Sequence, residues 1–445
     1  MTDFGAALLP GRVFASGSEP YERATTPRNA RSVQRPLAVV RAHHPDDVTV
    51  CVRAAADAGV KVAVQATGHG AAVDITSDQV LLDLSALDNV EVDAQARVVR
   101  AGPGATFAKI NAAAFRHGLL APGGTAGDVG VAGYTALGGV GWMTRPHGLA
   151  SASLLSVDVI DATGRRLHAD DTHHDEVLWG WRGGGGVGIA TQLELRLFPA
   201  NDLHAGLMLW SADHAEAIIP AWGRALPDLD PSLTSALGIL KAPDAPFVPE
   251  HLRGKPVVHL SAATIGGEAA MQTLRHALAS LPDPSLDTLG ACDDKRLTTI
   301  HLDPPVPVPA LGTGRWLRAE AGEHALTILA EAEISPDSPL VKVELRHVTA
   351  PPSDISGALT SCPGDLTLHA LGPAKDDTTT GPVEAALTRV LATTKPVDAG
   401  QSVASFCDGR VQVPEAYPPV VAARLDTVRR TLDPEGLISP SRHLK

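Results

Sequence analysis

An apolar run that ends in a turn of very small residues is the strongest constraint on how this chain folds. Residues 62–65 are typical of a buried strand, and the letters that follow are A-T-G-H-G-A-A. The glycines at 68 and 70 allow a ligand to approach the backbone closely. His69 is the reactive side chain of this turn, and its neighbours are too small to cover it. The turn is therefore a candidate site for binding or bonding a large ligand.

Composition limits the classes of protein to which the chain can belong. Its 445 residues predict two domains, or one domain with a large insertion. The net charge of −13 argues against a nucleic-acid or anionic-membrane partner, because binding phosphates needs clustered lysine and arginine. No stretch approaches the ~20 apolar residues that span a bilayer, and the first residues lack the basic start of a signal peptide. We therefore expect a cytoplasmic protein.

Cysteines and histidines do not indicate a metal site. The four cysteines are scattered without C-x-x-C spacing, which predicts reduced thiols rather than a zinc site or a disulfide framework. The pairs His43-His44 and His173-His174 are adjacent side chains, which rarely converge on one ion, so we expect them to be solvated.

The N-terminal part predicts an α/β unit followed by antiparallel strands. Residues 36–65 read as strand, helix and strand, with the helix ending at Gly59. Residues 154–169 read as a hairpin, and the alternation at 189–198 predicts a further strand. Pro199 marks the expected domain boundary.

Beyond this boundary the sequence becomes richer in proline-containing loops. Proline-rich loops such as 303–309 separate strand-like and helical segments. Residues 341–347 and 366–371 are expected strands of a second sheet. The last segments predict a strand at 402–407 and a helix from about 416 to 432.

Three glycine-rich loops are candidates for binding a ligand, although the common nucleotide-binding motifs are absent or stand in the wrong context. The G-x-G-x-x-G match at 183–188 precedes an alternating strand, whereas the dinucleotide fingerprint must follow a strand and open a helix. The chain has no P-loop, no H-E-x-x-H and no G-x-S-x-G. The loops at 67–70, 123–141 and 183–188 each offer backbone N–H groups to a ligand. Singly, each is most simply a tight turn; together, in one α+β segment, they predict a long cofactor lying over many backbone amides.

Six segments in order carry a resemblance to a known family. They are P-L-A-V-V-R-A-H-H-P-D-D-V from 36, V-A-V-Q-A-T-G-H-G from 62, L-L-D-L-S from 81, R-A-G-P-G-A-T-F from 100, V-G-V-A-G-Y-T-A-L-G-G-V-G-W-M-T-R-P-H-G-L from 129, and D-E-V-L-W-G-W-R-G-G-G-G-V-G-I-A-T from 175. The segment L-D-P-E-G-L-I near the C-terminus also resembles that family. Over nearly its whole length the chain resembles the berberine-bridge-enzyme-like branch of the vanillyl-alcohol-oxidase/PCMH superfamily.

The resemblance implies an α+β fold with three parts. Residues 1–199 would form the PCMH-type FAD-binding domain, made of two α/β subdomains. Residues 200–400 would form a substrate domain with an antiparallel sheet covered by helices. Residues 401–445 would return to the FAD-binding domain.

The resemblance also assigns the cofactor. His69 matches the histidine that bonds covalently to the 8α-methyl carbon of FAD, with the turn around Gly68 and Gly70 receiving the pyrophosphate. The segment from 129 to 141 would line the ribityl chain and the flavin ring, and Ile189 would lie near the adenine. The implied FAD-binding residues are Ala66, Thr67, Gly68, His69, Gly70, Ala71, Ala126, Asp128, Val129, Gly130, Gly133, Tyr134, Gly138, Gly139, Gly141, Ile189 and Phe406.

The chain departs from the family in its cofactor motifs. The usual R-x-G-G-H is Q-A-T-G-H here, with Gln65 and Thr67 in place of arginine and glycine. Ala126 stands where members with a second flavin bond carry cysteine. A cysteinyl link is therefore excluded at that position, and FAD is expected to be linked through His69 alone or merely bound.

A further departure concerns catalysis. Many members have a Y-x-N-Y-x-D segment whose tyrosine helps to deprotonate an alcohol, but the matching letters here are V-A-S-F-C-D from 403. Candidates for the missing base lie in the second sheet: Glu344, Arg346 and His369, with Tyr134 near the flavin. The alternative for Glu344 and Arg346 is a solvated face or a structural ion pair.

The expected function is that of an FAD-dependent oxidoreductase. A hydride from a small organic substrate, of secondary-metabolite or amine type, would pass to flavin N5, and O2 would reoxidise the flavin. A carbohydrate or alcohol oxidase using His369 or Glu344 as base is one alternative. A flavin-binding scaffold for a non-redox cyclisation is another.

Overall fold

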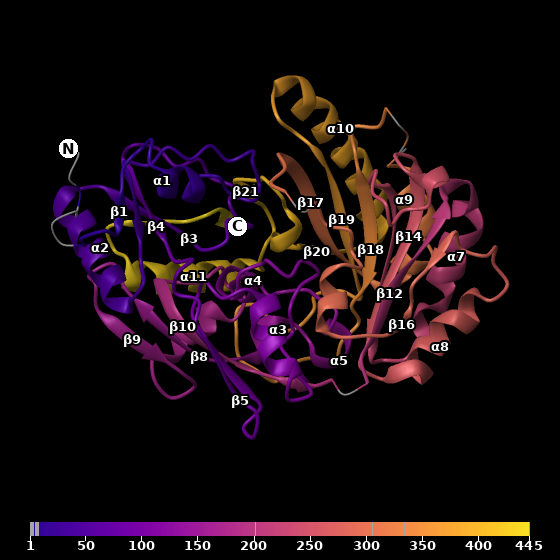
Figure 1. Cartoon of the computed structure of the whole chain (residues 1–445), viewed down its shortest axis with the longest axis horizontal. Helices are drawn as coiled ribbons and strands as arrows, with labels where there is room; N and C mark the ends of the chain where they lie inside the picture. Colours follow the sequence, from indigo (N-terminus) through magenta and orange to yellow (C-terminus); the bar gives the residue numbers. More distant parts are fainter. Residues whose placement is uncertain are drawn as a thin grey trace.

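The computed structural model describes residue 4 and residues 9–200, 202–304, 306–332, 335 and 337–444 (Figure 1). Most of the N-terminal stretch that argues against a signal peptide lies outside these residues. Within them, no helix combines the length and apolar character needed to cross a membrane.

The predicted strand, helix and strand at 36–65 start a mostly parallel sheet. In spatial order its strands are β1 (Val13–Phe14), β2 (Ala38–Arg41), β4 (Gln79–Asp83), β3 (Lys61–Gln65) and β22 (Ile438–Ser439). Helix α2 (Pro45–Ala58) joins β2 to β3 and ends at Gly59, whose φ of 66° suits glycine. Because β22 pairs in parallel with β3, the end of the chain lies beside the strand that leads into the His69 turn.

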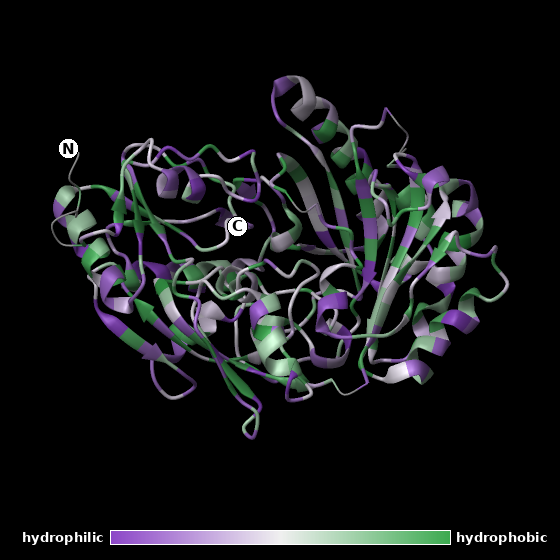
Figure 2. Cartoon of the chain, in the orientation of Figure 1, coloured by the Kyte–Doolittle hydropathy of each residue, from purple (hydrophilic) through white to green (hydrophobic). Residues whose placement is uncertain are grey.

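An antiparallel sheet follows, as the hairpin and alternation patterns predict. Its strands, in spatial order, are β5 (Val90–Asp93), β6 (Val98–Ala101), β10 (Ile189–Arg196), β8 (Leu154–Ile160) and β9 (Arg166–Ala169). Its core packs against α3 (Phe107–Phe115), α6 (Asp175–Trp181) and α11 (Pro419–Leu432). The edge strand β9 alternates exposed and buried residues and is largely hydrophilic in Figure 2.

Strands between residues 204 and 402 build one large antiparallel sheet. In spatial order its strands are β15 (Leu286–Asp287), β12 (His204–Ser211), β14 (Pro256–Thr264), β13 (Leu233–Lys241), β18 (Lys342–His347), β19 (Leu366–Pro373), β17 (Ala310–Leu317) and β20 (Asp398–Ser402), with β16 (Gly290–Ala291) beside β12. The two strands predicted at 341–347 and 366–371 are its central neighbours β18 and β19.

A layer of helices covers one face of this sheet. They are α7 (Ala215–Ala225), α8 (Gly267–Leu278), α9 (Ala325–Ala330) and α10 (Asp377–Thr394) (Figure 1). Together with the sheet they enclose a large apolar core that includes Val343 and Leu345 of β18. Since strand residues alternate, Glu344 and Arg346 lie on the opposite face. This face is the one that builds the site.

The prediction of a strand at 402–407 is wrong. Strand β20 ends at Ser402, and residues 404–406 form a 3₁₀ turn that folds over β17. The turn packs there because Gly314 of β17 has no side chain, since a Cβ at Gly314 would come 2.5 Å from Cβ of Phe406. The helix predicted from about 416 is α11, which begins at Pro419 and ends at Leu432.

Candidate functional site

A cavity of about 380 Å³ lies between the N-terminal part and the large sheet. Its walls come from the turn after β3, from the segment around α4 (Val131–Ala136) and from β18 and β19. Gly185 of the third glycine-rich loop also reaches it. The three loops that the sequence analysis singles out therefore meet at one cavity.

Most of the residues assigned to FAD by resemblance lie in this wall. Those that line the cavity are Ala66, Thr67, Gly68, His69, Gly70, Ala71, Ala126, Val129, Gly130, Gly133, Tyr134 and Phe406. Asp128 touches His69 instead of lining the cavity. Gly138, Gly139 and Gly141 pack behind the wall, and Ile189 is buried in the core of the parallel sheet.

The glycines behind the wall have a packing role. A Cβ at Gly141 would come 2.0 Å from the carbonyl oxygen of Gly123 and 2.7 Å from Oη of Tyr134. Gly139 has a φ of 75° and also packs against the Tyr134 ring. Only glycine fits here, because any side chain would displace Tyr134 from the cavity.

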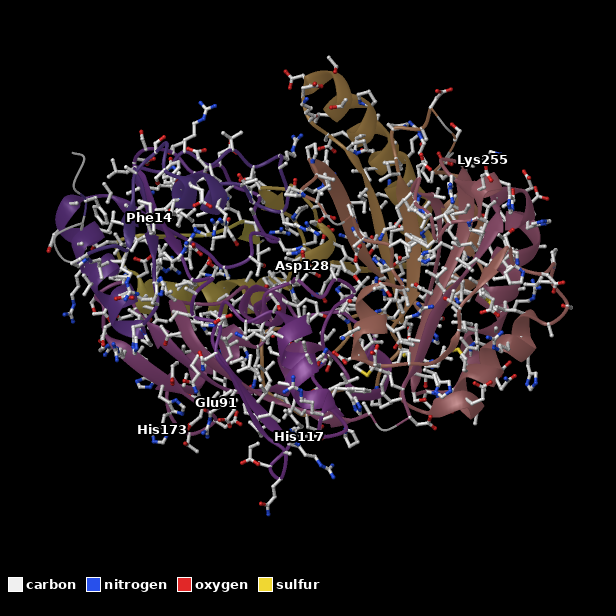
Figure 3. All side chains as sticks on the ribbon, in the orientation of Figure 1. Phe14, Glu91, His117, Asp128, His173 and Lys255 are labelled. Carbon is white, nitrogen blue, oxygen red and sulfur yellow. The ribbon has the colours of Figure 1, made fainter. Side chains whose placement is uncertain are left out.

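His69 contacts a carboxylate at the edge of the cavity. Its Nε2 lies 3.0 Å from Oδ1 of Asp128, at hydrogen-bond distance although the N–H is not well aligned. Arg28 lies 3.1 Å from the other oxygen of Asp128. Figure 3 shows Asp128 near the centre of the molecule, between the N-terminal part and the large sheet. His69 first, and Arg28 with it, lower the pKa of Asp128, which stays a carboxylate.

Tyr134 supplies a neutral phenol to the cavity. The edge of its ring contacts Phe107 at a centroid distance of 4.9 Å. Burial raises the pKa of Tyr134, although Arg346 opposes the rise. The Oη atom is buried and has no hydrogen-bond partner within the part of the chain that the structure describes. Tyr134 is therefore a hydrogen-bond donor or acceptor toward a ligand, and its ionised form is disfavoured as a base.

Glu344 is the centre of a buried ion-pair network rather than a base. Its Oε1 accepts from Nη2 of Arg346 at 2.8 Å, and its Oε2 lies 2.7 Å from Nε2 of His301. Nδ1 of His301 lies 2.8 Å from Asp303, and Nζ of Lys342 lies 3.1 Å from Nε2 of His301. Although burial favours its neutral form, His301 and the two other cations hold the pKa of Glu344 well below its usual range. Glu344 does not line the cavity, which favours the structural ion pair as its role.

Arg346 reaches the cavity from this network. Its guanidinium lies 5.3 Å from the ring of Trp142 and 5.4 Å from that of Phe406. Nη2 binds Glu344, while Nε is buried without a partner. The aromatic contacts and the ion pair fix the group, because planar guanidinium stacks on rings and forks onto carboxylates.

His369 has the geometry of a proton acceptor. It pairs with Glu344 across β18 and β19, and its ring stacks on Phe406 at 4.7 Å. Nε2 lies 2.8 Å from Oδ2 of Asp408, whereas Nδ1 is buried without a partner in a side chain that lines the cavity. Burial, and Lys342 after it, lower the pKa of His369 although Asp408 opposes them. With the proton on Nε2, the lone pair of Nδ1 is free to accept a proton.

Several residues of the site were not predicted from the sequence. His301 and Asp303 lie at the start of a proline-rich loop, where nothing in the sequence marks their approach to β18. Asp408 could have been found, because it is the last letter of the V-A-S-F-C-D segment and matches the aspartate of the family pattern. Arg442 lines the cavity from the C-terminal segment, where Nη2 donates to the carbonyl of Gly70. Among the described residues no His, Cys, Asp and Glu cluster could hold a metal ion.

The cavity fits a large polar cofactor such as FAD. Seven buried polar atoms of its wall residues have no well-aligned hydrogen-bond partner among the described residues: Oε1 of Gln34, Nε2 of His69, Oη of Tyr134, Nε of Arg346, Nδ1 of His369, Oγ of Ser405 and Nε of Arg442. Buried polar groups are almost always hydrogen-bonded, so this set indicates a polar ligand. The small residues at 66–71 and 126–130 leave the backbone open, and Arg442 supplies a positive charge beside them.

Comparison with known proteins agrees with this cofactor. Residues 36–170 match the family model described as the FAD binding domain. (R)-6-hydroxynicotine oxidase of Paenarthrobacter nicotinovorans is 25% identical over 96% of this chain and 95% of that protein. The uncharacterized FAD-linked oxidoreductase YvdP of Bacillus subtilis (strain 168) is 30% identical, but the matched region spans 53% of this chain and about half (54%) of YvdP.

Solved structures show the same fold. The BBE-like 1 protein of Physcomitrella patens superposes with a TM-score of 0.82 at 16% identity, covering 100% of this chain and 99% of that one. A chitooligosaccharide oxidase superposes with a TM-score of 0.80 at 18% identity, covering 99% and 98%. These likenesses establish the two-part α+β architecture, and the substrate has to be argued from the site.

Proposed function

We propose that this FAD-dependent oxidoreductase oxidises the carbon next to the nitrogen of a small organic amine. The observation that carries this proposal is the His369–Asp408 pair, with Nδ1 of His369 unpartnered at the cavity wall. When bound, FAD supplies an acceptor for the substrate's hydride, and we propose O2 as the final electron acceptor. The residues of the chain bind the amine, orient it and take its proton.

His369 is better matched to an amine than to an alcohol. An amine must lose its ammonium proton before its C–H bond can release a hydride. Moving a proton from an ammonium with a pKa of about 10.4 to a free histidine with a pKa of about 6.5 costs about 5 kcal/mol. The cost is higher for His369, because burial lowers its pKa. Moving the proton of an alcohol to a free histidine costs about 12 kcal/mol, because the pKa of the alcohol is close to that of water, about 15.7. The second case needs a stronger base, such as the tyrosine that the family pattern has and this chain lacks.

Asp408 and Phe406 would set the geometry of this transfer. Asp408 keeps the proton of the neutral imidazole on Nε2, and Phe406 holds the ring plane. As His369 takes the substrate's proton, the nearby carboxylate of Asp408 stabilises the imidazolium that forms. Arg346 and Tyr134 offer donors to acceptor groups of the ligands in the cavity.

We also propose that His69 holds FAD covalently and alone. This proposal is supported by the place of His69 in the cavity wall and by Ala126, which lines the same cavity where a cysteine would be needed for a second bond. Acid precipitation tests the bond. Yellow colour should stay in the pellet of the wild-type protein and leave that of His69→Ala; release of all FAD from the wild type would refute the covalent bond but not the fold.

Anaerobic mixing with a panel of amines, alcohols and sugars tests the reaction. The proposal predicts that at least one secondary or tertiary amine bleaches the flavin absorbance, and that matched alcohols do so far more slowly. Bleaching by a sugar or alcohol alone would overturn the amine assignment. Failure of the whole panel, with normal bleaching by dithionite, would favour a scaffold without redox turnover.

A further inference from the structure

We propose that Asp128 is a positioning residue that orients His69 for its bond to FAD and stabilises the charge that develops on the imidazole. This inference rests on the proposed covalent attachment. Asp128 lies where the family motif C-P-T-V-G has threonine, directly after the small pair Ala126 and Gly127. The carboxylate is thus a feature of this chain's own sequence.

The geometry supports a fixed role for each nitrogen of His69. Nε2 lies 3.0 Å from Oδ1 of Asp128 but its N–H is not aligned with that oxygen, so a rotation of the ring that aligns the two would set a proton on Nε2 against the carboxylate. The lone pair of the neutral ring is then on Nδ1, which is the nitrogen left to form the bond. A carboxylate that orients the ring and holds one tautomer makes the other nitrogen a better nucleophile.

Arg28 keeps the carboxylate in place. It lies 3.1 Å from Oδ2 of Asp128, the oxygen that does not face His69. Asp128 is half-exposed, so a proton that reaches it can leave to solvent. The three side chains form a short line, Arg28–Asp128–His69, at the edge of the cavity.

The step balances with O2 as the oxidant. A bond forms between Nδ1 of His69 and the 8α carbon, while one C–H bond of the 8α methyl and the N–H bond at Nε2 break. The methyl proton goes to solvent, and the imidazole proton leaves by way of Asp128. The two electrons of the broken C–H bond pass through the flavin to O2, which takes up two protons and becomes hydrogen peroxide. The positive charge that the imidazole carries on the way is the charge that Asp128 stabilises.

Three variants test the role of Asp128 by the amount of acid-stable flavin, not by activity. Asp128→Asn keeps the shape and removes the charge, and Asp128→Glu restores the charge. Asp158→Asn is the matched control, because Asp158 also contacts a histidine, with Oδ1 2.6 Å from Nδ1 of His168, but does not line the cavity. Each protein is purified under air, its total FAD is measured in the native state, and the flavin retained after acid precipitation is measured over time.

We expect Asp128→Asn to bind FAD but to form the covalent bond at least tenfold more slowly than the wild type. Asp128→Glu should recover most of the rate, and Asp158→Asn should match the wild type. Equal rates in Asp128→Asn and the wild type would overturn the inference. If Asp128→Asn binds no FAD, Arg28→Gln gives the second measurement: slower bond formation supports the inference and an unchanged rate overturns it. Wild-type protein without acid-stable flavin would refute the covalent proposal itself, and with it this role of Asp128.

Discussion

Replacing His369 removes the proton acceptor that the cavity offers to a substrate. His369→Gln keeps a polar side chain that can still bond to Asp408 but has no basic nitrogen. A positioned general base contributes about 10²- to 10⁴-fold to a rate, so kcat/KM should fall by that factor. The FAD content should stay near that of the wild type, because the remaining atoms of the FAD-binding wall are unchanged.

The magnitude for Asp408 follows from its contact with His369. Asp408→Asn keeps an acceptor 2.8 Å from Nε2 but makes it neutral. A hydrogen bond to a charged group is worth about 1 to 1.5 kcal/mol more than one between neutral groups, so the imidazolium loses about that much stabilisation. This corresponds to a loss of about tenfold in kcat/KM.

The pH profile gives an independent check on the same pair. His369 works as the neutral base, and burial lowers its pKa below the ordinary value of 6.5. The part of kcat/KM that depends on His369 is therefore present above its pKa and is lost as the pH falls through it, so the acid limb should lie below pH 6.5. Because Asp408 raises the pKa of His369, Asp408→Asn should move this limb to still lower pH.

A matched control separates catalysis from packing. His347 is also buried, on β18, but does not line the cavity, and its pKa is lowered by burial to about 3. Steady-state kinetics over pH for His369→Gln, Asp408→Asn and His347→Gln is the assay. Equal losses in His369→Gln and His347→Gln, or an acid limb that does not move in Asp408→Asn, would refute the assignment of His369 as base.

Further predictions concern the network and the cavity wall. Glu344→Ala leaves buried cations unpaired and should lower the free energy of unfolding by about 3–5 kcal/mol, measured with urea; a change below about 1 kcal/mol would contradict the network. Tyr134→Phe should weaken FAD binding about three- to tenfold in titrations of the non-covalent His69→Ala background, because it removes the unpartnered hydroxyl; unchanged affinity would mean that FAD does not use it. Gly183→Ala should abolish FAD loading of the purified protein, since φ is 90° there and the new Cβ would lie 2.3 Å from the carbonyl of Leu359; normal loading would show that the loop can shift.

Local patterns predict the elements that wrap the cofactor. The strand before His69, the helix ending at Gly59 and the hairpin at 154–169 depend on local apolar periodicity and turn residues, and each is present. The prediction of a strand at 402–407 is wrong because a residue far away in the sequence determines the conformation of this segment. Gly314, on another strand, leaves room for Phe406 to pack in a turn.

In the site, too, local patterns could be predicted and contacts between distant residues could not. Most of the cavity-lining residues that the resemblance assigns to FAD lie in two short segments, 66–71 and 126–134, which carry motifs and could therefore be named from the sequence. Glu344 and His369 could be placed on the right strands, but their roles could not be separated, because the partners that distinguish them come from elsewhere. His301 and Asp303 arrive from a loop, and Asp408 follows the 3₁₀ turn. Burial among cations keeps Glu344 an anion, while one carboxylate and an open nitrogen support His369 as the base that we propose.

Anaerobic single-turnover bleaching of the flavin by an amine and its deuterated form tests the central claim most directly. The account predicts that bleaching is slowed severalfold when deuterium replaces hydrogen on the carbon next to nitrogen, and that it slows at low pH in the wild type but is slow at all pH values in His369→Gln. Bleaching without an isotope effect, or with the same rate in His369→Gln as in the wild type, would contradict hydride transfer assisted by this base.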